Sequence, residues 1–106
     1  MQTTIERQHS RVSVPISVIL DCTSGRREVR VADLSVGGCY VDTIVAINAE
    51  DPVGLKFLLP NSGIVEIPGT VAYVHNGIGF GVQFTDMTRE QRSALETVIL
   101  MNGGAL

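Results

Sequence analysis

Apolar and polar residues alternate along two early segments of the chain. Residues 12–20, VSVPISVIL, carry an apolar side chain at every second position. Residues 28–34, EVRVADL, alternate in the same way and place Val29 and Val31 on one face with Arg30 on the other. A period of two is that of a strand with one buried face. The pattern therefore predicts two strands, joined by a turn at residues 21–25, where Asp, Ser and Gly favour tight bends.

Four more strands are predicted downstream. They are expected in the GGCYVDT segment that starts at residue 37 and at residues 55–60, 64–75 and 78–84. Residues 50–54 are expected to break the chain, and Pro68-Gly69 to bend residues 64–75 through a bulge or corner. Asn76-Gly77 is a strong hairpin signal. Six short strands joined by tight turns predict a mostly antiparallel sandwich or small barrel.

The last segment has the period of a helix. In residues 88–101, Leu95, Val98 and Ile99 fall on one stripe at spacings of three and four. Thr88 followed by Gln91 fits a capping box at the start of the helix, and residues 102–104 are predicted to end it. We expect this helix to cover a mouth or an edge of the sheet.

The chain is organised as one domain that follows a polar N-terminal segment. At 106 residues and 44% hydrophobic content, it can bury a single modest core. Residues 1–11 are polar and unpatterned, so they are predicted to form a flexible N-terminal arm. Residues 12–101 are predicted to form the barrel with its helix, and residues 102–106 a tail.

Charge, apolar runs and cysteines narrow the class of protein. A net charge of −3 argues against DNA or RNA as a partner. No apolar run is long enough to cross a bilayer, and no secretory signal is apparent, so we expect a cytoplasmic protein without membrane insertion. Cys22 and Cys39 lack metal or redox spacing and are predicted to be free thiols, although a disulfide is possible in principle.

Catalysis finds no support in the sequence. The two histidines, His9 and His75, fall in the arm and beside the Asn-Gly turn, and neither has the partners of a nucleophilic triad. No group of residues has metal-ligand spacing. We therefore expect no catalytic residue, no metal and no cofactor, and we predict that the chain is not an enzyme.

The arginines are distributed unevenly. Residues 1–30 hold five arginines against three acids, whereas the rest of the chain is strongly acidic. Arg7 and Arg11 lie four residues apart in the arm, and the guanidinium fork suits phosphate oxygens and the O6/N7 edge of guanine. The pair is either solvated surface charge or part of an anion site.

A second polar motif follows at residues 33–38, DLSVGG. One interpretation is a plain turn in which Asp33 and Ser35 cap backbone amides and Gly37 or Gly38 adopts a positive φ. The other is a small pocket in which Asp33 accepts the N–H groups of a guanine and Ser35 offers its hydroxyl. In that pocket, Gly38 lets a ligand approach the backbone. Together, the arm and this turn could close around a guanine nucleotide.

The two motifs resemble those of the PilZ domain family. Residues 7–11 match RxxxR and residues 33–38 match DxSxxG, and the order of the later strands and the closing helix is similar over residues 5–101. The resemblance implies a six-stranded β-barrel that binds the bacterial second messenger cyclic di-GMP, with an arm that wraps over the ligand. The binding residues it implies are Arg7, Arg11, Asp33, Ser35 and Gly38, with Gln8 and Gly37 as weaker candidates.

The resemblance also implies a downstream protein partner, such as motility, chemotaxis or polysaccharide-synthesis machinery. Glu6 stands where many family members have a further arginine, which favours one bound ligand over a stacked pair. The alternative is an interaction adaptor of the same fold that does not bind the nucleotide; intact motifs weigh against it. A binder of single-stranded nucleic acid would need exposed aromatics, whereas Tyr40, Tyr73 and the three phenylalanines fall mostly at core-like positions.

Overall fold

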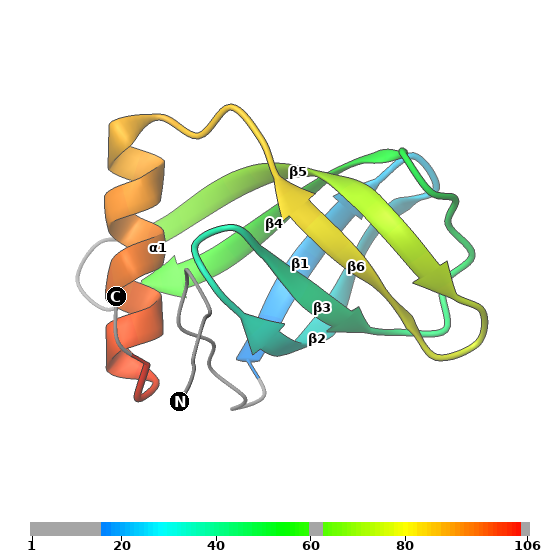
Figure 1. Ribbon diagram of the computed structural model, residues 1–106, viewed down its shortest axis with the longest axis horizontal. Helices are drawn as coiled ribbons and strands as arrows, with labels where there is room; N and C mark the ends of the chain where they lie inside the picture. The colour runs from blue at the N-terminus through cyan, green and yellow to red at the C-terminus, as the bar shows by residue number, and fades with distance from the viewer. Residues whose placement is uncertain (1–15, 60–62, 105–106) are drawn as a thin grey trace, which may run out of the picture.

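The computed structural model describes residues 16–59 and 63–104. These residues form six strands and one helix, which confirms the predicted mainly β fold class (Figure 1). The elements are β1 (Ile16–Cys22), β2 (Gly25–Leu34), β3 (Gly38–Asp42), β4 (Pro52–Leu59), β5 (Gly63–His75), β6 (Gly79–Phe84) and α1 (Arg89–Met101). The predicted arm, residues 1–11, lies outside the described residues.

The strands close into a barrel. Their order around it is β1-β2-β3-β6-β5-β4, and every neighbouring pair is antiparallel. β5 is long enough to pair with β4 through residues 63–70 and with β6 through residues 69–75. The barrel closes where residues 19–21 of β1 pair with residues 54–56 of β4. The antiparallel barrel predicted from the short strands is therefore present.

Alternation along the strands produces the core. Val18, Leu20, Val29 and Val31 are buried and Arg30 is exposed, as the period of two predicts. All three phenylalanines are buried inside the barrel, and no polar or charged side chain is buried among the described residues. A closed barrel of this size is filled by its own inward side chains, so ligand chemistry has to take place on its outer surface.

Two predictions about chain breaks were wrong. β4 begins at Pro52, so residues 52–54 belong to the strand instead of preceding it. The break lies just before the strand, at Glu50, whose φ is 74°. Backbone hydrogen bonds that join residues 50–51 to Val71 stabilise this turn. Proline is tolerated here because the first strand position can lack an N–H donor. The first turn is also shorter than expected, since only Thr23 and Ser24 separate β1 from β2.

A bulge or a corner was predicted at Pro68-Gly69, and no bulge occurs there in the ladder with β4. Both residues stay in register with β4, and the Pro68 carbonyl accepts a hydrogen bond from Thr85 N at 3.0 Å. The irregularity lies between Val71 and Tyr73, in the ladder with β6. One extra residue at this point reverses the side to which the following side chains point.

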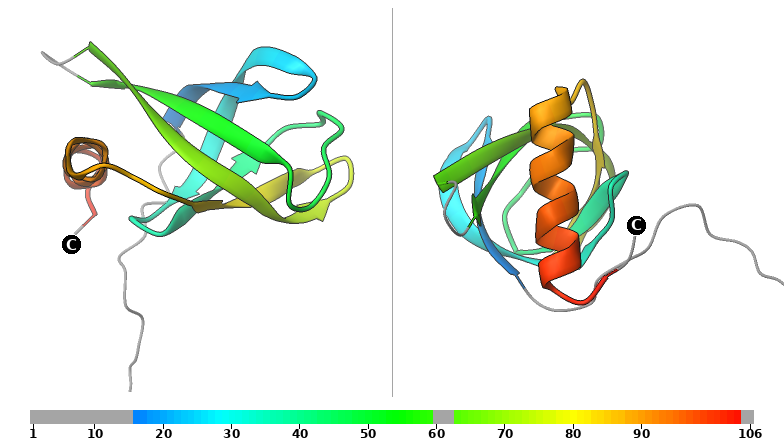
Figure 2. Two further views of the ribbon diagram at one scale, coloured as in Figure 1. Left: turned by 90° about the horizontal axis from the view of Figure 1, so that it is seen from above. Right: turned by 90° about the vertical axis from the view of Figure 1, so that its left-hand side faces the viewer.

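Helix α1 begins and ends as predicted. Thr88 is the N-cap: its Oγ1 accepts from Gln91 N at 3.0 Å, and Gln91 Oε1 accepts from Thr88 N at 2.8 Å. Leu95, Val98 and Ile99 are buried. Gly103, just past the end, has a φ of 93°, a conformation suited to glycine. The helix crosses one mouth of the barrel (Figure 2).

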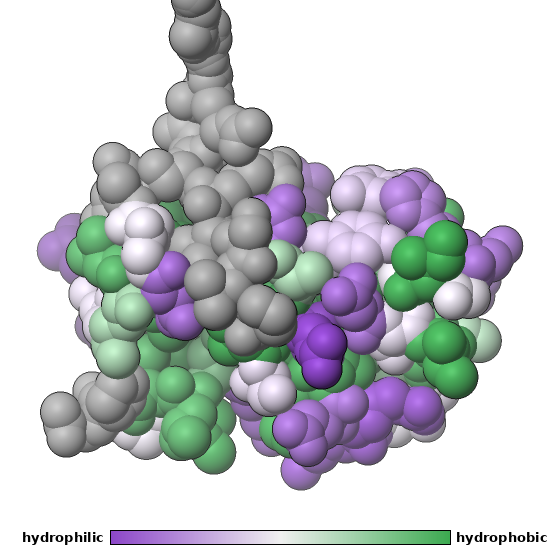
Figure 3. All heavy atoms as spheres, turned by 90° about the horizontal axis from the view of Figure 1, so that it is seen from below, coloured by the Kyte–Doolittle hydropathy of each residue, from purple (hydrophilic) through white to green (hydrophobic). Residues whose placement is uncertain are grey.

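The opposite end of the barrel is made of loops. Ile47 from the loop after β3 is buried there, whereas Ile44 in the same loop and Ile78 after β5 are exposed. Thr43 N donates to Ile78 O at 3.2 Å, so the two loops are joined. Apolar side chains are visible at this right-hand end of the space-filling view (Figure 3). In the described part of the chain, no helix is long and apolar enough to cross a membrane.

Candidate functional site

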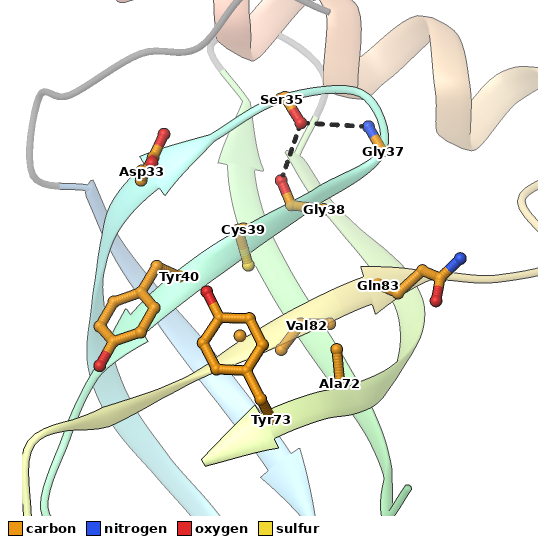
Figure 4. Close-up of a pocket in the computed structure, with 11 residues that line it drawn as sticks. Asp33, Ser35, Gly37, Gly38, Cys39, Tyr40, Ala72, Tyr73, Val82 and Gln83 are labelled. Atoms are coloured by element: carbon orange, nitrogen blue, oxygen red, sulfur yellow. Dashed lines mark hydrogen bonds between the residues drawn. The ribbon is translucent and has the colours of Figure 1, made fainter. Parts of the chain in front are cut away.

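A surface pocket lies at the turn between β2 and β3. It has a volume of about 220 Å³, and Asp33, Ser35, Gly37 and Gly38 line one side of it. β5 and β6 supply the other side, including Tyr73 and Gln83 (Figure 4). The fold therefore brings Asp33, Ser35, Gly37 and Gly38 together at one site. Arg7, Gln8 and Arg11 lie outside the described residues.

Ser35 shapes the turn that borders the pocket. Its N–H donates to Gly38 O at 2.9 Å, its hydroxyl donates to the same carbonyl at 3.3 Å, and Gly37 N donates to its Oγ at 3.3 Å (Figure 4). These bonds fix the hydroxyl beside the pocket in a defined orientation. The turn interpretation and the pocket interpretation of this motif are thus compatible.

The conformation expected for the two glycines was wrong. Neither Gly37 nor Gly38 has a positive φ; among described glycines that conformation occurs at positions 25, 63, 77 and 103. Gly38 is needed for a different reason, because a Cβ there would collide with the carbonyl oxygen of Val82. The glycine therefore permits close approach of β3 to β6, and this position cannot carry a larger residue without local movement.

Two tyrosines extend the pocket across the outer face of the sheet. Tyr40 on β3 and Tyr73 on β5 are both in register with Gly81 on β6, and their ring centroids are 6.3 Å apart. A Cβ at Gly81 would collide with the Tyr73 ring, so the bare backbone of β6 forms the floor beneath that ring. The aromatic residues were expected mostly at core-like positions; the three phenylalanines are buried, whereas Tyr73 is 49% exposed and Tyr40 is half-buried.

The sequence pattern predicts the outward orientation of one of these tyrosines but not of the other. Tyr40 precedes buried Val41, so strict alternation along β3 points it outward. Tyr73 is two residues beyond buried Val71, and strict alternation would turn it inward. It faces outward because of the irregularity between Val71 and Tyr73. Only the first of these positions could have been found from the sequence.

His75 completes this aromatic group. Its Nδ1 is 3.1 Å from the Tyr40 hydroxyl, and its ring centroid is 5.2 Å from that of Tyr73. Desolvation raises the pKa of Tyr40, and Asp42 and Tyr73 raise it further. The phenol of Tyr40 therefore stays protonated at neutral pH, and the three rings form an aromatic surface beside Asp33.

The two cysteines are free, as predicted. Burial raises the pKa of Cys39, which lines the pocket, and the nearby Asp33 carboxylate raises it further. A thiol that stays protonated is a poor nucleophile. No group of three or more potential metal ligands occurs in the described ranges, residues 16–59 and 63–104.

Cys39 should therefore react with iodoacetamide at least about 100-fold more slowly than Cys22 at about pH 8, since the thiolate is the reactive form. Peptide mass spectrometry over a time course would give both rates. The same reaction in guanidinium chloride is the control, because unfolding removes the burial and the two rates should converge. Equal rates in the folded protein would show that the Cys39 thiol is not protected.

The barrel, the helix across one mouth and the outward-facing pocket define a small β-barrel domain with a surface site. The family model for the PilZ domain matches residues 5–100, and the chain belongs to this family. No curated protein matches the sequence. Family membership supports the expectation of a binding domain and not an enzyme.

Solved structures agree on the fold. The PilZ domain of CeSA from a cellulose-synthesizing bacterium has a TM-score of 0.67 at 20% identity, covering 86% of this chain and 95% of that one. The PilZ domain of YcgR from Escherichia coli, solved with c-di-GMP, has a TM-score of 0.72 at 14% identity, covering 92% of each chain.

A third similar structure is larger. The Bacillus subtilis inhibitor of motility, MotI/DgrA, has a TM-score of 0.74 at 16% identity, and the match covers 95% of this chain but 53% of that protein. This chain therefore spans about half of the length of that inhibitor. At these levels of identity the likeness is one of fold.

Proposed function

We propose that this protein is a cytoplasmic receptor for cyclic di-GMP. The observation that carries the proposal is that a member of the PilZ family holds both polar motifs intact, and that the fold gathers the DxSxxG residues at one surface pocket. The solved YcgR domain binds the same ligand on a similar fold.

The residues have complementary roles in this proposal. Asp33 accepts hydrogen bonds from the N–H groups of one guanine, and the Ser35 hydroxyl contacts nearby polar atoms. Arg7 and Arg11 contribute forked donors to guanine and phosphate oxygens. Gly37 and Gly38 form the edge of the site, with Gln8 as a weaker contact. The Tyr40 and Tyr73 rings offer the ligand an aromatic surface next to this edge, where a purine can stack.

Signal relay follows from the position of the arginines before the barrel. Ligand phosphates neutralise the arm and hold it against the barrel, which changes the surface offered to a partner protein. The partner is expected in motility, chemotaxis or polysaccharide-synthesis machinery; an inhibitor of motility and the PilZ domain of CeSA from a cellulose-synthesizing bacterium share the fold. Glu6 disfavours additional anionic charge, so we propose one ligand per site.

Calorimetric titration tests the proposal. Cyclic di-GMP should bind with a dissociation constant below about 10 μM and a stoichiometry of one, because several charge-assisted hydrogen bonds contribute. GTP and cyclic di-AMP serve as matched controls and should bind at least about 100-fold more weakly, since each lacks part of the recognised chemistry.

Absence of heat and of any shift in melting temperature with cyclic di-GMP would contradict the receptor function. That outcome would favour the alternative, an interaction adaptor of the same fold that does not bind the nucleotide.

A further inference from the structure

The outer face of the β4–β5 hairpin carries an apolar patch away from the pocket. Leu58 is 76% exposed and Ile64 is 66% exposed, although both are large aliphatic residues in strands. Half-buried Ile19 of β1 lies beside them and lines a shallow hollow with both. We call Ile19, Leu58 and Ile64 the hairpin patch. The hairpin reaches past the barrel mouth alongside α1 (Figure 2).

The register of the hairpin places two opposite charges next to this patch. Leu58 pairs with Ile64, and one outward position further along, Lys56 pairs with Glu66. Side chains two residues apart share a face of a strand, so all four lie on the outer face. Lys56 and Glu66 form no ion pair, and the Glu66 carboxylate lies over the bare Cα of Gly54.

We propose that the hairpin patch is the contact surface for a second copy of this chain. The two copies are related by a two-fold axis that runs along the midline of the hairpin, between the facing sheets. This rotation lays β4 of each copy over β5 of the other, so each residue faces the residue with which it pairs within its own hairpin. Leu58 then faces Ile64 of the second copy, and Lys56 faces Glu66.

Self-complementarity is the reason to choose a second copy over another partner. A two-fold interface requires one surface to match itself, so that each contact occurs twice. The hairpin meets this requirement in the placement of its apolar and charged side chains: two aliphatic pairs lie at one end and two opposite-charge pairs at the other. A foreign partner would need no such relation between the two strands.

The interface is small, which determines its strength. Stable complexes bury about 1,200 Å² or more in total, and the two aliphatic and two charged side chains that each copy brings face to face supply less. The dimer should therefore be weak and form at high protein concentration. It does not depend on nucleotide binding, so it can be tested on the ligand-free protein.

Sedimentation velocity from about 10 μM to about 1 mM should show a monomer that converts to dimer as concentration rises. The double variant Leu58→Ser/Ile64→Ser should remain a monomer throughout this range. Ile44→Ser is the matched control, because Ile44 is equally apolar and 85% exposed at the opposite end of the barrel. Its association should equal that of the wild type.

Charge exchange tests the two-fold register. Lys56→Glu alone and Glu66→Lys alone each place like charges opposite one another and should weaken self-association about ten-fold. Mixing the two variants creates a heterodimer in which every facing pair has opposite charge, so association should return to near the wild-type level. This rescue cannot arise within one chain.

Three results would overturn the proposal. They are a monomer at all concentrations, a dimer that survives the Leu58→Ser/Ile64→Ser change, and a mixture of the charge variants that associates no better than either variant alone.

Discussion

Replacing Arg11 or Arg7 by alanine is expected to weaken cyclic di-GMP binding at least about 100-fold, because each change removes a forked, charge-assisted pair of hydrogen bonds to the ligand. The melting temperature of the ligand-free protein should change by no more than about 2 °C, since polar substitutions in a segment that the sequence predicts to be a flexible arm should cost little. The core and the strand ladders of the described structure are built from residues 16–59 and 63–104. Calorimetry and thermal unfolding measure the two effects separately.

Arg89→Ala is the matched control for this experiment. Arg89 is an exposed arginine at the start of α1, and it does not line the pocket. Its loss should leave binding within about two-fold of the wild type, because screening weakens distant charges. A large drop in melting temperature on loss of Arg7 or Arg11 would mean that these arginines support the fold, and wild-type affinity would remove them from the site.

Leu95→Ala should lower the free energy of unfolding by roughly 2–5 kcal/mol, the cost of removing a large buried aliphatic side chain and leaving a cavity. Leu95 has no exposed surface, and with Val98 and Ile99 it packs into the core at the barrel mouth. For a domain of this length the change corresponds to a fall of more than about 10 °C in melting temperature. Urea unfolding followed by circular dichroism gives the free energy directly.

Leu100→Ala in the same helix is the control. Leu100 is 53% exposed, so its truncation should cost less than about 1 kcal/mol. If both variants lost the same stability, the helix would contribute through its intrinsic propensity and not through docking of its buried stripe on the barrel mouth.

Most elements of the fold could be predicted from local pattern. Val29 and Val31 turn inward and Arg30 outward because alternation is a geometric property of an extended chain. The capping box at Thr88 and Gln91 is equally local, since both partners lie within one turn. The start of β4 could not be predicted, because a proline such as Pro52 is compatible both with a loop and with the first residue of a strand.

Only some residues of the candidate site could be predicted from the sequence. Asp33 and Ser35 could be selected because their spacing is that of a polar turn and of the family motif. The outward orientation of Tyr73 could not be predicted, because it depends on an irregularity between Val71 and Tyr73 that no local residue signals. The need for glycine at position 38 comes from the carbonyl of Val82, more than forty residues away.

By itself the sequence determined the elements and two polar motifs, because alternation, helical period, capping and turn chemistry act over a few residues. Only the tertiary structure decided what meets on the outer face of the barrel. Closure of the sheet places β3, β6 and β5 side by side, so Tyr40 and Tyr73 flank the bare backbone of Gly81 next to the Asp33 turn. Such neighbours follow from strand order and register, which depend on the whole chain.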